Sequence, residues 1–232
     1  MIDWRQYWEE FPQKFAEGEF CRQVGRTANG GIPTPARELN VVIDEIVALL
    51  DLVPGDRLLD LCCGNGLLTA RLAHFCTSVV GVDFSNPMVQ IARQHHSAAN
   101  TKYLEGSVLE LDRILDAAAF DKVCMVESLA YFDPGQLARI LRGLSAVSAA
   151  RATILFSGVL DEEAKWSFFD TAERRAAYEQ QRREGREIMG RWWTRSEIAS
   201  AASANGFQAK ILRQSPSLNT AHYRFNVLME RG

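Results

Sequence analysis

The sequence predicts an α/β protein with a Rossmann-like, doubly wound sheet that is mostly parallel and ends in an antiparallel C-terminal strand hairpin. Short apolar runs alternate with helical patterns through most of the chain, and two strand-like runs follow each other directly at its end. The alternation indicates parallel strands joined by right-handed crossover helices. The final pair has no helix between its members, which indicates a hairpin.

Each expected element has its own pattern. The parallel strands are short apolar and β-branched runs, as strands covered on both faces require: 57–61, 77–83, 102–105, 120–126 and 152–157. The helices between them carry apolar residues at three- and four-residue spacings: 66–75, 85–98, 108–115 and 134–148. Ser85 can cap the second of these helices by accepting a hydrogen bond from an early backbone N–H.

The end of the chain departs from the alternation. A helix over 194–204 starts with a capping box and stops before a glycine. Strand-like runs follow over 207–212 and 223–229, and the ten residues between them are too few for a crossover helix. We therefore expect these two strands to pair as an antiparallel hairpin.

Composition sets limits on what the chain does. Its 232 residues are 47% hydrophobic and 24% charged, which fits one globular α/β domain. The formal net charge of −3 and the scattered basic residues argue against a nucleic-acid partner. The charged N-terminus and the lack of a long apolar run predict a cytoplasmic protein that does not bind a membrane. Five cysteines without a CxxC pair favour reduced thiols and predict no metal site.

We divide the expected single domain, residues 1–232, by the position of its core. The predicted segments are an N-terminal lid (1–39), a cofactor-binding core (40–160), an inserted helical cap (161–190), and a C-terminal helix with the hairpin (191–232). The lid and the cap are rich in aromatic residues, and both could fold over the carboxyl edge of the sheet. Core packing would explain the same aromatics.

The most informative motif is the first strand-to-helix turn. Gly64 and Gly66 let the backbone turn sharply and let a ligand approach it at the start of a helix. Asp83 ends the next strand, so its carboxylate should lie beside this turn and can accept hydrogen bonds from the two hydroxyls of a ribose. Asp60 could either face the ligand or brace the turn.

These residues resemble the first two motifs of the class I S-adenosylmethionine-dependent methyltransferases. The family's acidic residue and GxGxG loop correspond to Asp60 and to the turn, with Cys62 where the first glycine usually stands. Ser107 stands where the family often has an acid that contacts adenine. The resemblance implies S-adenosyl-L-methionine as cofactor, bound by residues of four strand-to-helix turns: Asp60, Cys62, Cys63, Gly64, Asn65, Gly66, Asp83, Phe84, Ser85, Met88, Gly106, Ser107, Val108, Val126, Glu127 and Ser128. Core packing would equally explain Phe84 and Met88.

Several candidates lie outside that turn set. Arg26, in a glycine-bearing loop, could pair the cofactor's carboxylate or be a solvated arginine. His222, in the hairpin loop, is a candidate catalytic base, although an exposed loop histidine is the alternative. Tyr131 is the second catalytic candidate, and a structural helix-start role is its alternative. His95 and His96 are expected to face solvent.

The function predicted from these patterns is methyl transfer to a small-molecule nucleophile by direct displacement, in which proximity supplies much of the catalysis. The Asn-Pro-Pro-Tyr motif of amino-methylating nucleic-acid enzymes is missing after the fourth strand. An NAD(P)-dependent reductase is an alternative, but its fingerprint requires Gly or Ala where Thr69 stands. A catalytically idle cofactor-binding protein is another. A homodimer is possible, and the sequence does not identify the methyl acceptor.

Overall fold

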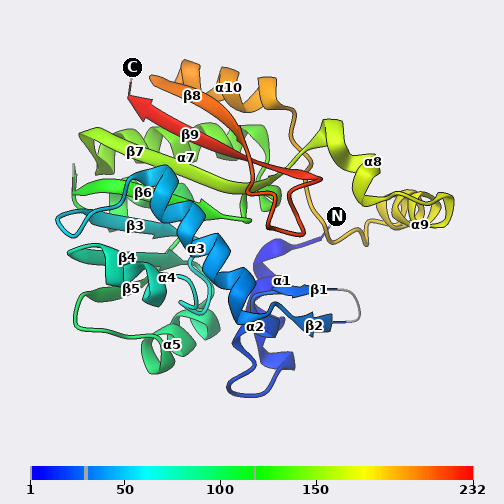
Figure 1. Ribbon diagram of the computed structural model, residues 1–232, viewed down its shortest axis with the longest axis horizontal. Coiled ribbons are helices and arrows are strands. Elements are labelled where there is room, and N and C mark those ends of the chain that lie inside the picture. The colour runs from blue at the N-terminus through cyan, green and yellow to red at the C-terminus, as the bar shows by residue number, and fades with distance from the viewer. Residues whose placement is uncertain (1, 29–30, 118, 232) are drawn as a thin grey trace.

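The computed structural model describes residues 2–28, 31–117 and 119–231, and its centre is a sheet that within these residues has the strand order β5-β4-β3-β6-β7-β9-β8 (Figure 1). Strands β3 to β7 pair in parallel, whereas β9 is antiparallel to both of its neighbours. The strands are β3 (Arg57–Leu61), β4 (Ser78–Asp83), β5 (Thr101–Glu105), β6 (Phe120–Val126), β7 (Ser148–Leu160), β8 (Phe207–Arg213) and β9 (Arg224–Arg231). The predicted fold class and the hairpin are confirmed.

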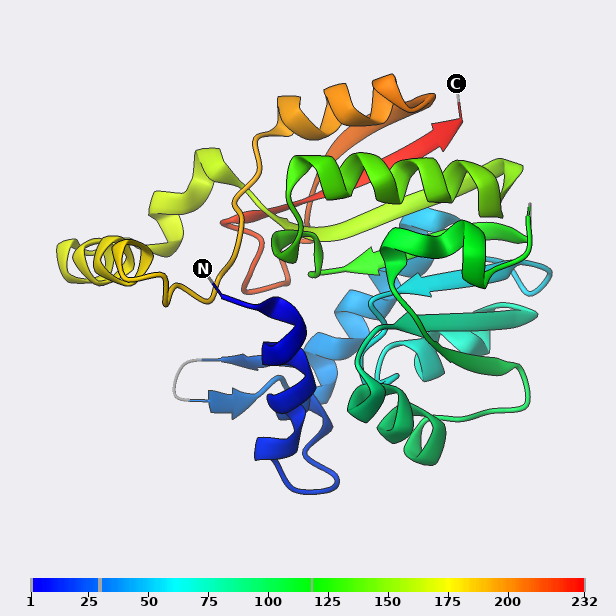
Figure 2. The same ribbon diagram turned by 180° about the vertical axis from the view of Figure 1, so that it is seen from behind.

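Helices cover both faces of the sheet, and each face has its own apolar core (Figure 2). One face is covered by α6 (Leu111–Ile114), α7 (Pro134–Val147) and α10 (Arg195–Ala204). The other is covered by α3 (Ala36–Leu50) and α4 (Thr69–Leu72). Short 3-10 turns accompany them: η3 (Ala73–Phe75), η4 (Val108–Glu110) and η5 (Leu129–Tyr131).

The helix caps expected from the sequence are present. Helix α5 (Asn86–His95) is capped by the Ser85 side chain, which accepts a hydrogen bond from the backbone of Met88. Helix α10 begins with a capping box between Thr194 and Glu197. These caps fix where the helices leave the strands.

Helix α3 was not predicted from the sequence. Its start at Pro35 has no side-chain cap, and its C-cap is Asp51 with a positive φ of 48° instead of a glycine. Its apolar residues nevertheless repeat at helical spacing and are buried: Leu39, Val42, Ile43, Ile46 and Leu50. The amphipathic pattern was therefore present, but the usual start and stop signals were not.

Two boundaries differ from prediction for local reasons. Strand β7 is longer than the expected 152–157 because it pairs along β9 as well as β6, with a register shift between Phe156 and Val159. The expected helix 66–75 is reduced to α4 and η3 because residues 62–68 form an extended turn. That turn is the centre of the candidate site.

The N-terminal segment and the 161–190 insertion lie near the carboxyl ends of the parallel strands (Figures 1 and 2). The first contains α1 (Trp4–Glu10), η1 (Pro12–Lys14), α2 (Phe20–Gln23) and the short β1–β2 pair (Thr27–Ala28, Ile32–Pro33). The second contains η6 (Glu162–Ala164), α8 (Lys165–Phe168) and the projecting α9 (Ala172–Arg183). Asn29 and Gly30, part of the expected Arg26 loop, lie outside the described residues.

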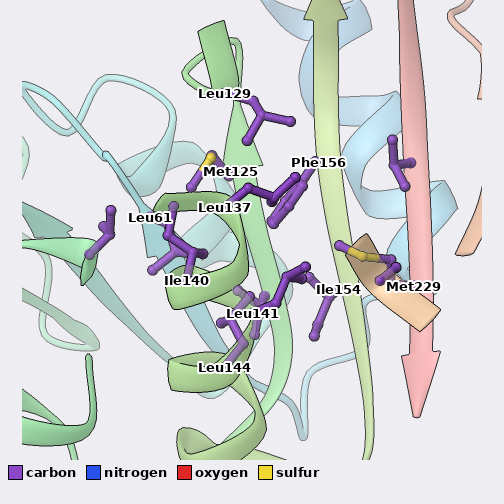
Figure 3. Close-up of a cluster of buried hydrophobic side chains, with 14 of the residues drawn as sticks. Leu61, Met125, Leu129, Leu137, Ile140, Leu141, Leu144, Ile154, Phe156 and Met229 are labelled. Carbon is purple, nitrogen blue, oxygen red and sulfur yellow. The ribbon is translucent and has the colours of Figure 1, made fainter. Parts of the chain in front are cut away.

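The larger core lies between α7 and the sheet (Figure 3). Leu137, Ile140, Leu141 and Leu144 form one buried stripe along α7. They pack against the strands that carry the candidate site, so the apolar core holds those strand ends in place.

Replacing a residue of this stripe should destabilise the fold. Leu144→Ala removes a fully buried side chain, and we expect the free energy of unfolding to fall by about 2 to 5 kcal/mol. The exposed neighbour Arg142→Ala on the same helix should change it by less than about 0.5 kcal/mol. Urea denaturation followed by circular dichroism measures both. Equal losses in the two variants would contradict the assigned packing of α7.

Candidate active site

A cavity of about 370 Å³ opens where β3, β4 and β6 end. It is lined by glycine-turn residues, by residues after β4 to β6, and by residues of the N-terminal segment. Fifteen of the residues singled out in the sequence line it: Arg26, Asp60, Cys62, Cys63, Gly64, Asn65, Asp83, Phe84, Met88, Ser107, Val108, Val126, Glu127, Ser128 and Tyr131.

Four candidates are not among the lining residues. Gly66 lies where a side chain would clash, since a Cβ on it would lie 2.7 Å from the Tyr103 hydroxyl. Ser85 caps helix α5. A Cβ on Gly106 would similarly meet Ile114. His222 is an exposed loop residue whose carbonyl accepts a hydrogen bond from Ser167, so the structure does not bring it into the cavity.

The Asp83 carboxylate joins two turns. One oxygen accepts a hydrogen bond from the Gly64 backbone N–H and the other accepts one from the Ser85 backbone N–H, each at 2.9 Å. Cys62 and Gly64 adopt positive φ values of 56° and 55°, so the turn has the left-handed geometry that favours glycine. Each carboxylate oxygen has a second lone pair, so Asp83 can still accept bonds from a ligand.

Asp60 is buried beneath the same turn. Its carboxylate accepts a hydrogen bond of 2.6 Å from the Thr69 hydroxyl, which ties β3 to α4. Burial raises the pKa of Asp60 to about 6, although the Thr69 hydrogen bond acts in the opposite direction. Asp60 therefore both braces the turn and faces the cavity.

Charged residues form the opposite wall. An Arg26 Nη1 lies 3.5 Å from a Glu127 carboxylate oxygen, and the two side chains are 10% and 24% exposed. Burial raises the pKa of Glu127, but the charges of Arg26 and Arg224 outweigh it and hold that pKa below its usual value. Glu127 has a positive φ of 55°, an uncommon conformation that clusters at functional sites.

Arg224, at the start of β9, lines the cavity but was not predicted from the sequence. Its Nη1 donates a 2.6 Å hydrogen bond to the carbonyl of Gly158, at the register shift in β7. A Cβ on Gly158 would lie 2.6 Å from the Glu127 side chain, so glycine leaves room for that carboxylate. A signal in the sequence was present: Arg224 lies two residues after His222, which was expected at this edge.

The N-terminal segment closes over the cavity with aromatic rings. Trp4 and Trp8 of α1 line it, and their ring centroids lie 4.8 and 5.4 Å from that of Tyr131. The Ser85 hydroxyl donates to the carbonyl of Trp8 at 3.0 Å. The Asn65 side-chain amide donates to the carbonyl of Phe20, in α2, at 2.9 Å. The N-terminal segment is thus attached to the turn after β3 through Asn65 and to the turn after β4 through Ser85.

The neighbouring cysteines and histidines have structural roles. Burial, and then the charges of Asp83 and Asp60, raise the pKa of Cys62 and Cys63, so both thiols remain protonated. His96 was expected to face solvent, but its Nδ1 lies 2.6 Å from the Asn65 carbonyl. His95 and His96 both pack on Phe20.

Within the described parts, 2–28, 31–117 and 119–231, no three His, Cys, Asp or Glu residues are placed to hold a metal ion. In the same parts, no helix is long and apolar enough to cross a bilayer.

Comparison with known proteins points to one family. Residues 58–150 match the family model described as a methyltransferase domain. The ubiquinone biosynthesis O-methyltransferase of Hahella chejuensis is 32% identical over 132 residues, which are 54% of this chain and 52% of that protein. The 2-phytyl-1,4-naphtoquinone methyltransferase of Nostoc sp. is 43% identical over 75 residues, which are 28% and 33% of the two chains. The chain spans about half the length of the first of these relatives.

Solved structures share the whole fold at low identity. Magnesium protoporphyrin IX methyltransferase from Synechocystis PCC 6803 with bound SAH aligns with a TM-score of 0.70 and 16% identity over 98% of both chains. Geranyl diphosphate C-methyltransferase from Streptomyces coelicolor A3(2) aligns with a TM-score of 0.63 and 13% identity over 99% of this chain and 98% of that one. At such identities the likeness establishes the fold.

The raised pKa of Asp60 predicts a pH-dependent stability. Because the folded state binds this proton more tightly than the unfolded chain, the contribution is greatest below about pH 4 and is lost as pH rises through about 6. Relative to Asp60→Asn, the wild type should therefore lose about 1 to 3 kcal/mol of unfolding free energy between about pH 4 and 7. Denaturation across this range measures it, with exposed Asp112→Asn as control. A difference in unfolding free energy between wild type and Asp60→Asn that does not change with pH would contradict the raised pKa of the Asp60 carboxyl.

Proposed function

We infer that this chain belongs to the class I S-adenosylmethionine-dependent methyltransferase family, and we propose that it transfers a methyl group from S-adenosylmethionine to a small-molecule nucleophile. The observation that carries the proposal is that one cavity brings together the glycine turn, Asp83 and the residues after β6. The relatives named above for ubiquinone biosynthesis and for 2-phytyl-1,4-naphtoquinone support a small acceptor.

The cavity fits an adenosine at one end. Phe84, Met88 and Val108 offer apolar surface that matches a base, and Asp83 retains lone pairs for the two ribose hydroxyls. Arg5 lies over the outer part of this end, with its guanidinium carbon 5.3 Å from the Phe84 ring centroid. The adenosine would thus lie between β4 and the N-terminal segment.

The charged wall fits the amino-acid end of the same cofactor. That end carries one carboxylate and one ammonium group, and the wall offers the Arg26 guanidinium and the Glu127 carboxylate as opposite partners. Val24, two residues before Arg26, lies beside the glycine turn, because a Cβ on Gly64 would lie 3.1 Å from Val24 Cγ1. In the complex, Arg26 would bind the cofactor's carboxylate and Glu127 would bind its ammonium group, in place of the contact between the two side chains.

When bound, the cofactor supplies a sulfonium-activated methyl group. The chain's own contribution is to orient the acceptor and exclude water with the rings of Trp4 and Trp8. Burial raises the pKa of Tyr131, so its hydroxyl stays protonated and would position the acceptor by donating a hydrogen bond. The expected base role of His222 has no geometric support, because that residue lies outside the cavity lining.

The buried position of Thr69 disfavours the reductase alternative. A dinucleotide fingerprint needs a small residue there so that the helix can pack closely on the strand. Thr69 is fully buried and uses its hydroxyl to bind Asp60. A cytoplasmic location, a homodimer and the absence of a nucleic-acid partner stay predictions.

Removing the Asp83 carboxylate should weaken cofactor binding. We expect Asp83→Ala to bind S-adenosylhomocysteine more weakly by a few kcal/mol, since hydrogen bonds to a charged group contribute about 1.5 to 3 kcal/mol each. Calorimetry measures this, with Asp112→Ala as control and circular dichroism to verify folding. The wild type should bind S-adenosylhomocysteine and not NADH. Unchanged affinity in folded Asp83→Ala, or binding of NADH alone, would overturn the assignment.

Arg26→Ala tests the amino-acid end separately. The variant should lose affinity for S-adenosylhomocysteine by about tenfold or more, and lose little for adenosine, which has no carboxylate. Calorimetric titrations with the two ligands give the comparison, and Arg213→Ala, exposed at the end of β8, is the matched control. Equal losses for both ligands would place the carboxylate elsewhere.

A further inference from the structure

Two buried hydrogen-bond donors in the cavity wall have no partner in the described part of the chain. They are the indole Nε1–H of Trp8 and the Nε–H of Arg224. Other buried unpaired polar atoms belong to residues outside the cavity lining. Because a buried donor without an acceptor costs free energy, this pair indicates a ligand that brings oxygen acceptors.

The charges of the same wall indicate that one of these acceptors is anionic. Arg26 is within ion-pair distance of Glu127, whereas none of the described carboxylates lies within 4.0 Å of the Arg224 guanidinium nitrogens. Asp60 and Asp83 are bonded to Thr69 and to the turn backbones. Among the described residues, Arg224 therefore has no ion-pair partner of its own within 4.0 Å, and the Glu127 charge acts on it only from a longer distance.

The proposed cofactor does not supply an acceptor for Arg224. Its carboxylate and ammonium would bind to Arg26 and Glu127, so neither group is assigned to Arg224. A second, polar cavity of about 90 Å³ adjoins Arg26 and Arg224, and its Glu38 is not within ion-pair distance of either arginine. Because an enclosed guanidinium without its own acceptor is costly when water is excluded, an acceptor that carries negative charge suits this position.

Arg224 is also held in a fixed position on the acceptor side. The Gly158 carbonyl accepts from its Nη1, and its guanidinium lies 5.3 Å from the Tyr223 ring centroid. It enters from β9, beyond β7, whereas the proposed adenosine site lies on the opposite side of the glycine turn at β4. A fixed guanidinium suits the planar geometry of a carboxylate.

The surroundings of this position are aromatic. Trp4, Trp8 and Tyr131 line the cavity. The Tyr131 ring centroid lies 4.8 Å from that of Trp4 and 5.4 Å from that of Trp8. Such surfaces favour a flat ligand through offset or edge-to-face contacts. Resting on the proposed function, we propose that the methyl acceptor is an aromatic carboxylic acid whose carboxylate is bound by Arg224.

The test uses the protein saturated with S-adenosylhomocysteine and titrated with matched probes. The probes are 4-hydroxybenzoate and 3,4-dihydroxybenzoate, each compared with its carboxamide, which has the same shape without the charge. We expect each acid to bind at least about tenfold more tightly than its amide, because a charge-assisted pair to a buried guanidinium is lost in the amide. Amides that bind as well as the acids, or acids that do not bind up to millimolar concentration, would overturn the proposal.

Variants then locate the anion. Arg224→Met should abolish the preference for acid over amide, Arg224→Lys should keep part of it, and the exposed control Arg213→Met should leave it unchanged. Affinity for S-adenosylhomocysteine should change by less than about threefold in all three. A preference that survives in folded Arg224→Met would place the anion elsewhere. Failure of S-adenosylhomocysteine to bind the wild type would instead contradict the proposed function. The titration of the wild type with S-adenosylhomocysteine, done before the probes are added, detects this separately.

Discussion

The Asp83 carboxylate is the interaction on which the rest of the site depends. By accepting from the backbones of Gly64 and Ser85, it joins the turn after β3 to the start of α5. Burial raises the pKa of Asp83, while these two N–H groups favour its charged form. The Ser85 hydroxyl extends the connection to α1 through the Trp8 carbonyl. One buried acid thus sets the distance between the glycine turn and the segment that closes over it.

A second constraint acts on the other side of the cavity. The register shift in β7 turns the Gly158 carbonyl toward Arg224 and leaves space for the Glu127 side chain. Bulges of this kind redirect side chains beside active sites. The first constraint shapes the proposed cofactor end and the second shapes the proposed acceptor end, which explains how a shared fold can carry different acceptor specificities.

The sequence predicted the sheet, the hairpin and most of the cavity lining because those features have local signals. Alternating periodicity identified the strands, and the glycine turn with Asp83 identified their shared edge. Helix α3 was missed because it lacks a capping side chain and a terminal glycine. Arg224 was missed because its position depends on a bulge between distant strands, which periodicity does not reveal. His222 was expected in the cavity from its loop alone, but it lies outside the cavity lining, and its backbone carbonyl accepts a hydrogen bond from Ser167 of the 161–190 insertion.

The most direct test of this account is a crystal structure of the protein with S-adenosylhomocysteine. We expect the ribose hydroxyls to hydrogen-bond to Asp83 and the ligand's carboxylate to contact Arg26 in place of Glu127, with the glycine turn and the β7 bulge unchanged. A ligand bound away from Asp83, or one whose carboxylate lies on Arg224 with the Arg26–Glu127 contact intact, would contradict it.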